Sequence, residues 1–151
     1  MNKFLQDLDA ELKEALKSHD ELKLSVVRMI KASLKNKEIE KMGTLIDDDV
    51  TSVLSSMAKQ RRESIEQFSA AGRTELADKE RKELEIIQSY LPKQLSPEEL
   101  DAILVSAIKE SNASSPADMG KVMKLVMPRI KGAADGKVVN LRVKELLTST
   151  S

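Results

Sequence analysis

The interior of this chain has to be built almost entirely from aliphatic side chains. Its 151 residues include two phenylalanines, one tyrosine and no tryptophan, whereas 40% are hydrophobic and 33% are charged. Leucine, methionine and alanine favour helices, and strands favour aromatic and β-branched side chains. We therefore expect a folded, all-α globule rather than a sheet or a disordered chain.

Apolar spacing and capping residues predict four helices in the first 95 residues. Leu16 belongs to the apolar stripe of the first helix, and a left-handed cap at Gly43 should end the second. Asp47 should cap the third helix, and Pro92 should stop the fourth. The expected ranges are about 3–17, 21–41, 47–72 and 74–91.

A separate helical unit should begin after Pro92. The run Ser96-Pro97-Glu98-Glu99 is typical of a capping box, with Ser96 as N-cap and Pro97 at the first helical position. Gly132 should end the middle of three helices, and Pro128 should kink that helix or close it early. The expected ranges are about 97–111, 116–131 and 136–147. The predicted domains are a four-helix N-terminal unit, residues 1–95, and a three-helix C-terminal unit, residues 96–151.

Charged residues interrupt the apolar stripes of the third and fourth helices. At about 100° per residue, Arg61 falls in the middle of the third helix's stripe, and Glu80 and Glu83 fall inside the fourth's. If Gly72 lies in the turn of an antiparallel hairpin, Arg61 and Glu83 face each other. We predict an ion pair between Arg61 and Glu83, with Glu80 as the alternative acceptor. Fixing the helix register is the main interpretation, and a functional pocket is the alternative.

Several kinds of chemistry lack the residues that they require. The chain has no cysteine, and its five scattered glycines form no phosphate-binding loop. His19, the single histidine, stands in a polar loop, where solvation is a simpler interpretation than acid–base catalysis. The run Asp47-Asp48-Asp49 could hold a hard cation, but its place at a helix start explains it. We expect no catalytic residue, no metal and no cofactor.

Net charge and hydropathy indicate where the chain should reside. The 25 basic residues balance the 25 acidic ones, so no whole-chain field attracts DNA or a membrane. Apolar runs are only a few residues long, and the first segment mixes acids with bases. We expect a cytoplasmic protein with neither a membrane nor DNA as its partner.

Positive charge is concentrated near the C-terminal end. Between Met119 and Lys144 there are seven bases and one acid. Lys121, Lys124 and Lys131 fall within about 80° of each other on the predicted middle helix. Six apolar side chains are expected on its opposite face: Met119, Val122, Met123, Val126, Met127 and Ile130.

This lysine face has two interpretations. Lysines commonly solvate the outer face of an amphipathic helix. The further bases Lys137 and Arg142 on the next helix favour a surface for a phosphate backbone instead.

An ordered set of short motifs resembles a known family. The chain is similar, over nearly its whole length, to the YqeY family of GatB/YqeY-domain proteins. The motifs that carry the resemblance are Val26 to Ala32, Lys59 to Ser64, Phe68, Ala71 to Arg73, Lys79-Glu80, Glu83-Leu84, Tyr90 to Pro92, Asp118 to Lys121, Lys131-Gly132, Asp135-Gly136 and Val139-Asn140.

The resemblance implies a function connected with tRNA. The C-terminal unit is similar to the tail of the B subunit of the amidotransferase that amidates misacylated Glu-tRNA or Asp-tRNA, where the tail contacts the tRNA body. Its matching residues here are Gly120, Lys121, Lys131, Gly132 and Asn140. Ala133 stands where the family commonly has lysine, so part of the implied positive charge is missing.

Three functions are consistent with these features. The first is a non-catalytic tRNA-binding or tRNA-metabolism accessory protein, with Lys121, Lys124, Lys131, Lys137 and Arg142 contacting phosphates. The second is an interaction module that docks on an amidotransferase or another translation protein. The third is carbon–nitrogen ligase activity with glutamine as amide donor, implied by family association alone.

Overall fold

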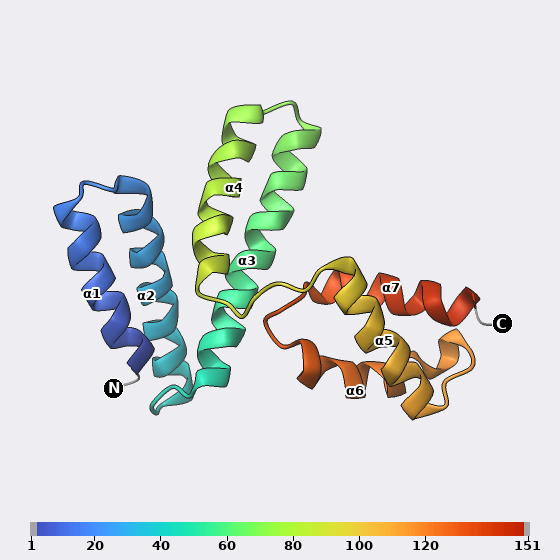
Figure 1. The fold of residues 1–151 in the computed structure, drawn as a ribbon. Coiled ribbons are helices and arrows are strands. Elements are labelled where there is room, and N and C mark those ends of the chain that lie inside the picture. The colour runs from blue at the N-terminus through green and yellow to red at the C-terminus, as the bar shows by residue number, and fades with distance from the viewer. Residues whose placement is uncertain (1–2, 150–151) are drawn as a thin grey trace. The chain divides into compact units, whose positions relative to one another are not determined.

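A computed structural model describes residues 3–149, and all regular structure in that range is helical (Figure 1). The expected all-α fold class is confirmed. The chain divides into two compact units, Met1–Leu91 and Pro92–Ser151, which we call unit 1 and unit 2. The predicted boundary between independent domains, after residue 95, stays a prediction.

Unit 1 consists of two helical hairpins. Helices α1 (Lys3–Lys17) and α2 (Glu21–Lys41) form the first, and α3 (Asp47–Ala70) and α4 (Thr74–Ser89) form the second (Figure 1). Helix α2 packs against the other three helices. The buried core residues are Leu8, Val26, Val27, Ile30, Leu34, Leu45, Val50, Leu54, Met57, Ala58 and Ile87.

Three local expectations for unit 1 were wrong. Met42, not Gly43, takes the left-handed conformation after α2, with a φ of 53°. Asp47 lies inside α3, and Ile46 is the N-cap residue, because the carboxylate of Asp49 accepts the Ile46 N–H at 2.9 Å. Leu16 is 48% exposed, since α1 turns Ala15 toward the core instead.

Unit 2 packs three α-helices around one core. Its elements are α5 (Pro97–Ser111), the short 3₁₀ helix η1 (Pro116–Asp118), α6 (Met119–Ile130) and α7 (Gly136–Ser149). The buried residues are Leu100, Leu104, Ala107, Val122, Val126, Ile130, Val139, Val143 and Leu147.

The ends of the helices in unit 2 follow from local chemistry. The hydroxyl of Ser96 accepts the N–H of Glu99 at 3.1 Å, as in the expected cap. The expected middle helix is divided, because Pro116 begins a 3₁₀ turn and α6 starts at Met119. Pro128 lies within the last turn of α6. Between residues 3 and 149, no helix has the length and apolar character needed to cross a membrane.

Candidate functional site

A partly buried ion cluster joins α3 to α4. The Nε of Arg61 lies 3.0 Å from Glu83 Oε2 and 3.5 Å from Glu80 Oε2. The three side chains are only 14%, 9% and 21% exposed, respectively. The turn at Gly72, whose φ is 72°, gives this register, because Arg61 and Glu83 each lie eleven residues from it. The structure therefore brings together the three residues that the interrupted stripes predict.

A third helix takes part in this cluster. The Nη2 of Arg61 lies 3.2 Å from the sulfur of Met29 on α2. A thioether is a weak acceptor, so it satisfies a guanidinium N–H without adding charge. The cluster thus connects three helices of unit 1. Met29 was missed from the sequence, since a methionine on an apolar face is usually only a core residue.

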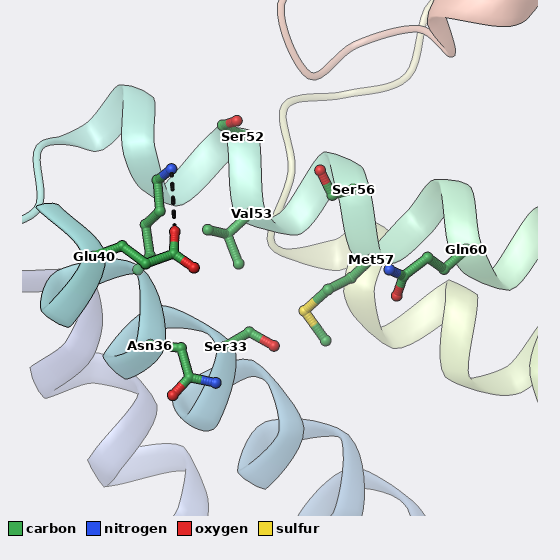
Figure 2. A pocket seen from close by; sticks show the side chains of 9 residues that line it. Ser33, Asn36, Glu40, Ser52, Val53, Ser56, Met57 and Gln60 are labelled. Carbon is green, nitrogen blue, oxygen red and sulfur yellow. Dashed lines mark ion pairs between the residues drawn. The ribbon is translucent and has the colours of Figure 1, made fainter.

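A groove between α2 and α3 is a second candidate site (Figure 2). Its volume is about 320 Å³. Val53 and Met57 form its apolar part, and serine hydroxyls and side-chain amides surround them (Figure 2). The lining residues are Ser33, Asn36, Lys37, Glu40, Ser52, Val53, Ser56, Met57 and Gln60.

Most of the side chains that line the groove are uncharged. Its only ion pair joins Lys37 and Glu40, whose Nζ and Oε2 atoms lie 3.9 Å apart. Hydroxyls and amides both donate and accept hydrogen bonds. The sequence signal for this groove was the four-residue spacing of the uncharged polar residues Ser52, Ser56 and Gln60 along one face of α3, which was missed because the apolar stripe alone was used to predict this helix.

The predicted lysine face begins on α6 and ends just beyond it. Lys121 and Lys124 are exposed on α6, whose opposite face buries Val122 and Val126. Lys131 is also exposed, but α6 ends at Ile130 and Lys131 has a non-helical ψ of 115°, so it does not belong to the helix as expected. The Nζ of Lys121 lies 3.8 Å from Asp118, a separation that leaves 71% of the lysine side chain exposed. Lysine at such positions provides a mobile point charge on a long stem.

Met127 does not belong to the buried face of α6, contrary to expectation. It is 47% exposed rather than buried. At about 100° per residue it lies at the edge of the stripe, roughly 140° from Val122. The buried stripe of α6 is therefore narrower than its sequence suggests.

The two predicted bases of α7 differ in their surroundings. Lys137 is exposed. Arg142 instead donates from Nε and Nη2 to the two carboxylate oxygens of Asp101 on α5, each at 2.8 Å, and from Nη1 to Glu145 at 2.9 Å. These hydrogen bonds hold the pKa of Asp101 below its ordinary value. Arg142 thus ties α7 to α5, a contact that the sequence analysis did not anticipate.

The motif glycines and asparagine have different roles. Gly132 has a φ of 74°, which favours glycine, and its carbonyl accepts the amide of Gln94 at 2.8 Å. A Cβ added at Gly120 would meet no atom within 4 Å, and Asn140 is exposed on α7. Gly132 is therefore required by the turn, whereas Gly120 and Asn140 are not required by packing.

An apolar hollow lies beside the Asp101–Arg142 pair. It occupies about 380 Å³ and includes Val138, which is 52% exposed. The other lining residues are Gln94, Leu95, Pro97, Leu100, Ala133, Ala134 and Asp135. Among residues 3–149, no group of histidine or carboxylate side chains is arranged to hold a metal ion.

These features define an all-helical protein whose polar groove lies in one unit and whose lysine face lies in the other. Residues 5–147 match the family described as Yqey-like protein, and the chain belongs to this YqeY family.

Curated relatives share sequence over most of the chain. It is 31% identical over 150 residues to "Altered inheritance of mitochondria protein 41, mitochondrial" of Pyrenophora tritici-repentis, covering 97% of this chain and 82% of that protein. The Candida glabrata protein of the same name is 34% identical over 120 residues, or 76% of this chain and 65% of that protein. The Lachancea thermotolerans protein is 32% identical over 114 residues, covering 74% of this chain and only 61% of the relative.

Proposed function

We propose that this chain is a non-catalytic tRNA-binding or tRNA-metabolism accessory protein, related to the tail of glutamine-dependent tRNA amidotransferase. The observation that carries the proposal is the set of exposed lysines formed by Lys121 and Lys124 on α6, opposite its buried face, and Lys131 directly after that helix. Lys137 extends this set onto α7.

Electrostatics makes phosphate the best ligand for this face. Residues 119–144 contain seven bases and one acid, although the whole chain is neutral. Each phosphate that a lysine neutralises releases condensed counterions, which favours binding at low salt. Arg142 joins the contact only by exchanging Asp101 or Glu145 for a phosphate, so the lysines provide most of the attraction.

The test is fluorescence anisotropy of labelled total tRNA at two salt concentrations. The wild type is compared with a variant carrying Lys121→Glu, Lys124→Glu and Lys131→Glu. We expect salt-sensitive binding by the wild type and its loss in the folded variant. A matched control changes three exposed lysines of unit 1 to glutamate and should retain most binding: Lys13, Lys17 and Lys35.

Two outcomes contradict the proposal. Absence of wild-type binding at low salt excludes this face as a tRNA site. Equal loss of binding in both triple variants shows that only net charge matters, since each variant changes the charge by the same amount.

The second proposed function is an interaction module that docks on an amidotransferase or another translation protein. A specific observation favours it: Ile39 in the last turn of α2, and Met42 and Ile46 in the connection to α3, are 65%, 91% and 56% exposed. Exposed apolar side chains gathered at one place commonly mark a binding surface.

The cellular location follows from the same proposal. A tRNA partner requires a compartment that contains tRNA, and the cytoplasm expected from the sequence is one. The names of the relatives place those proteins in mitochondria, which also contain tRNA. Fractionation of cells that produce the tagged chain distinguishes the two.

A further inference from the structure

The end of α2 and its connection to α3 carry exposed apolar side chains that folding does not explain. We call Ile39, Met42 and Ile46 the apolar corner; their exposed fractions are 65%, 91% and 56%. Leu45, between them, is 2% exposed and supplies the core contact of this segment. Met42 also has a φ of 53°, where glycine or asparagine is less strained. Neither stability nor solubility accounts for methionine at this position.

The groove of Figure 2 lies between the same two helices, α2 and α3, and Glu40, which lines it, stands between Ile39 and Met42 in the sequence. On α2 its lining residues span Ser33 to Glu40, and on α3 they span Ser52 to Gln60. At 1.5 Å per residue, these two faces run for about 10 Å, roughly two turns of a third helix. Serine at Ser52 and Ser56 leaves room for a close approach. This length suits two turns of a helix lying along the groove.

The surrounding charges select the chemistry of the partner. Residues 35–49 contain five acids and three bases. Two of these bases pair with two of the acids, because Lys37 lies 3.9 Å from Glu40 and Lys41 is bound to Asp49, and the excess of two acids remains. Apolar side chains edged by acids repel an anionic membrane surface and attract a cationic segment.

We propose that the apolar corner and the groove dock a basic amphipathic helix of a partner protein. This inference rests on the second proposed function, the interaction module, and specifies its partner. Apolar side chains of the partner cover Ile39, Met42 and Ile46. Its lysines or arginines lie toward Glu38 and Asp47, which flank the corner in the sequence.

The test uses three labelled synthetic helical peptides with one shared apolar face. Their polar faces carry lysine, glutamine or glutamate, and each peptide is titrated with the full chain by fluorescence anisotropy. We expect the lysine peptide to bind about tenfold or more tightly than the glutamine peptide, and the glutamate peptide not to bind.

A triple variant tests whether the apolar corner is the site. Ile39→Gln, Met42→Asn and Ile46→Ser remove the apolar side chains while suiting the backbone, because asparagine tolerates a left-handed φ and serine is a good N-cap. The variant should therefore melt no lower than the wild type. We expect its affinity for the lysine peptide to fall about tenfold or more. The control, Leu16→Gln with Leu141→Gln, removes two other exposed apolar side chains, which are 48% and 57% exposed, and should bind as the wild type does.

Each remaining outcome has a definite meaning. Undiminished binding of the lysine peptide by the triple variant overturns the proposal, since the attraction is then charge alone. Equal binding of all three peptides, lost in the triple variant, keeps the interaction module but overturns the basic partner. Binding of no peptide counts against both. Concentration-dependent self-association that the triple variant abolishes identifies a second copy as the occupant and also overturns the proposal.

Discussion

Arg61 in unit 1 and Arg142 in unit 2 each hold two carboxylates, but at different depths. The side chains of Arg61 and Glu83 are 14% and 9% exposed. Those of Arg142 and Asp101 are 39% and 37% exposed, although their two hydrogen bonds of 2.8 Å form the better geometry. Hydrogen-bond geometry alone therefore does not tell which of the two clusters contributes more to the stability of the fold.

The depth of burial should decide which cluster costs more stability when one partner is removed. A buried ion that loses its partner keeps the cost of leaving water, whereas water replaces the lost partner at an exposed site. The Arg61 cluster should therefore hold the register of α3 against α4, while Arg142 remains able to exchange partners.

The largest effect is expected for Arg61→Met. Methionine fills similar volume, but it leaves Glu83, whose side chain is 9% exposed, without its cation. We expect a loss of about 3 kcal/mol in the free energy of unfolding, as for other broken buried pairs. Urea denaturation followed by circular dichroism measures it. Arg28→Met on the exposed side of α2 is the control, and an equal loss in both variants contradicts the comparison.

The two carboxylates around Arg61 should contribute unequally. Glu83 accepts a hydrogen bond at 3.0 Å, whereas Glu80 lies 3.5 Å away and is more exposed. Glu83→Gln should cost about 1–2 kcal/mol, and Glu80→Gln distinctly less. A double-mutant cycle with Arg61→Met measures each coupling directly. Stronger coupling to Glu80 than to Glu83 would reverse the assignment.

Arg142→Met should have a smaller effect that is confined to unit 2. Water can solvate Asp101 once the guanidinium is removed, and salt already screens an exposed pair. We expect faster hydrogen exchange in α7, with little change in α3 and α4. The difference between wild type and variant should shrink at about 1 M salt. A salt-independent loss of stability as large as that of Arg61→Met would mean that exposure does not determine how much each cluster contributes to stability.

The helix pattern of this chain was largely predictable from its sequence. The expected ranges 3–17, 21–41 and 97–111 agree with α1, α2 and α5. The predictions of helix ends were wrong where several neighbouring residues could each have capped the helix. Any of three adjacent aspartates could complement the start of α3, and only the position of the Ile46 N–H selects Asp49. The left-handed Met42 breaks the usual preference for glycine, so no local rule places it.

The candidate sites were less predictable, for a physical reason. Two residues of opposite charge that interrupt the apolar stripes of adjacent helices are expected to pair across the hairpin, so the Arg61–Glu83 ion pair was predictable from the sequence. Arg142 and Asp101 lie 41 residues apart on polar faces, where any acid is an equally good partner before folding. The groove of Figure 2 depends on how α2 and α3 meet, and its serines look like ordinary surface residues.

The smallest effect concerns the acid stability of unit 2. Arg142 lowers the pKa of Asp101 below its ordinary value of 3.8, so the folded state favours the ionised carboxylate. The stabilisation is complete above the unfolded pKa and is lost as the pH falls through the lower, folded pKa. Asp101→Asn should therefore reduce stability at neutral pH and flatten its decline below about pH 4. Thermal melts between about pH 3 and pH 7 measure this, with Glu98→Gln on the first turn of α5 as control. An unchanged acid decline in Asp101→Asn would show that the exposed Arg142 pair adds nothing to folding, which would widen its contrast with the buried Arg61 cluster.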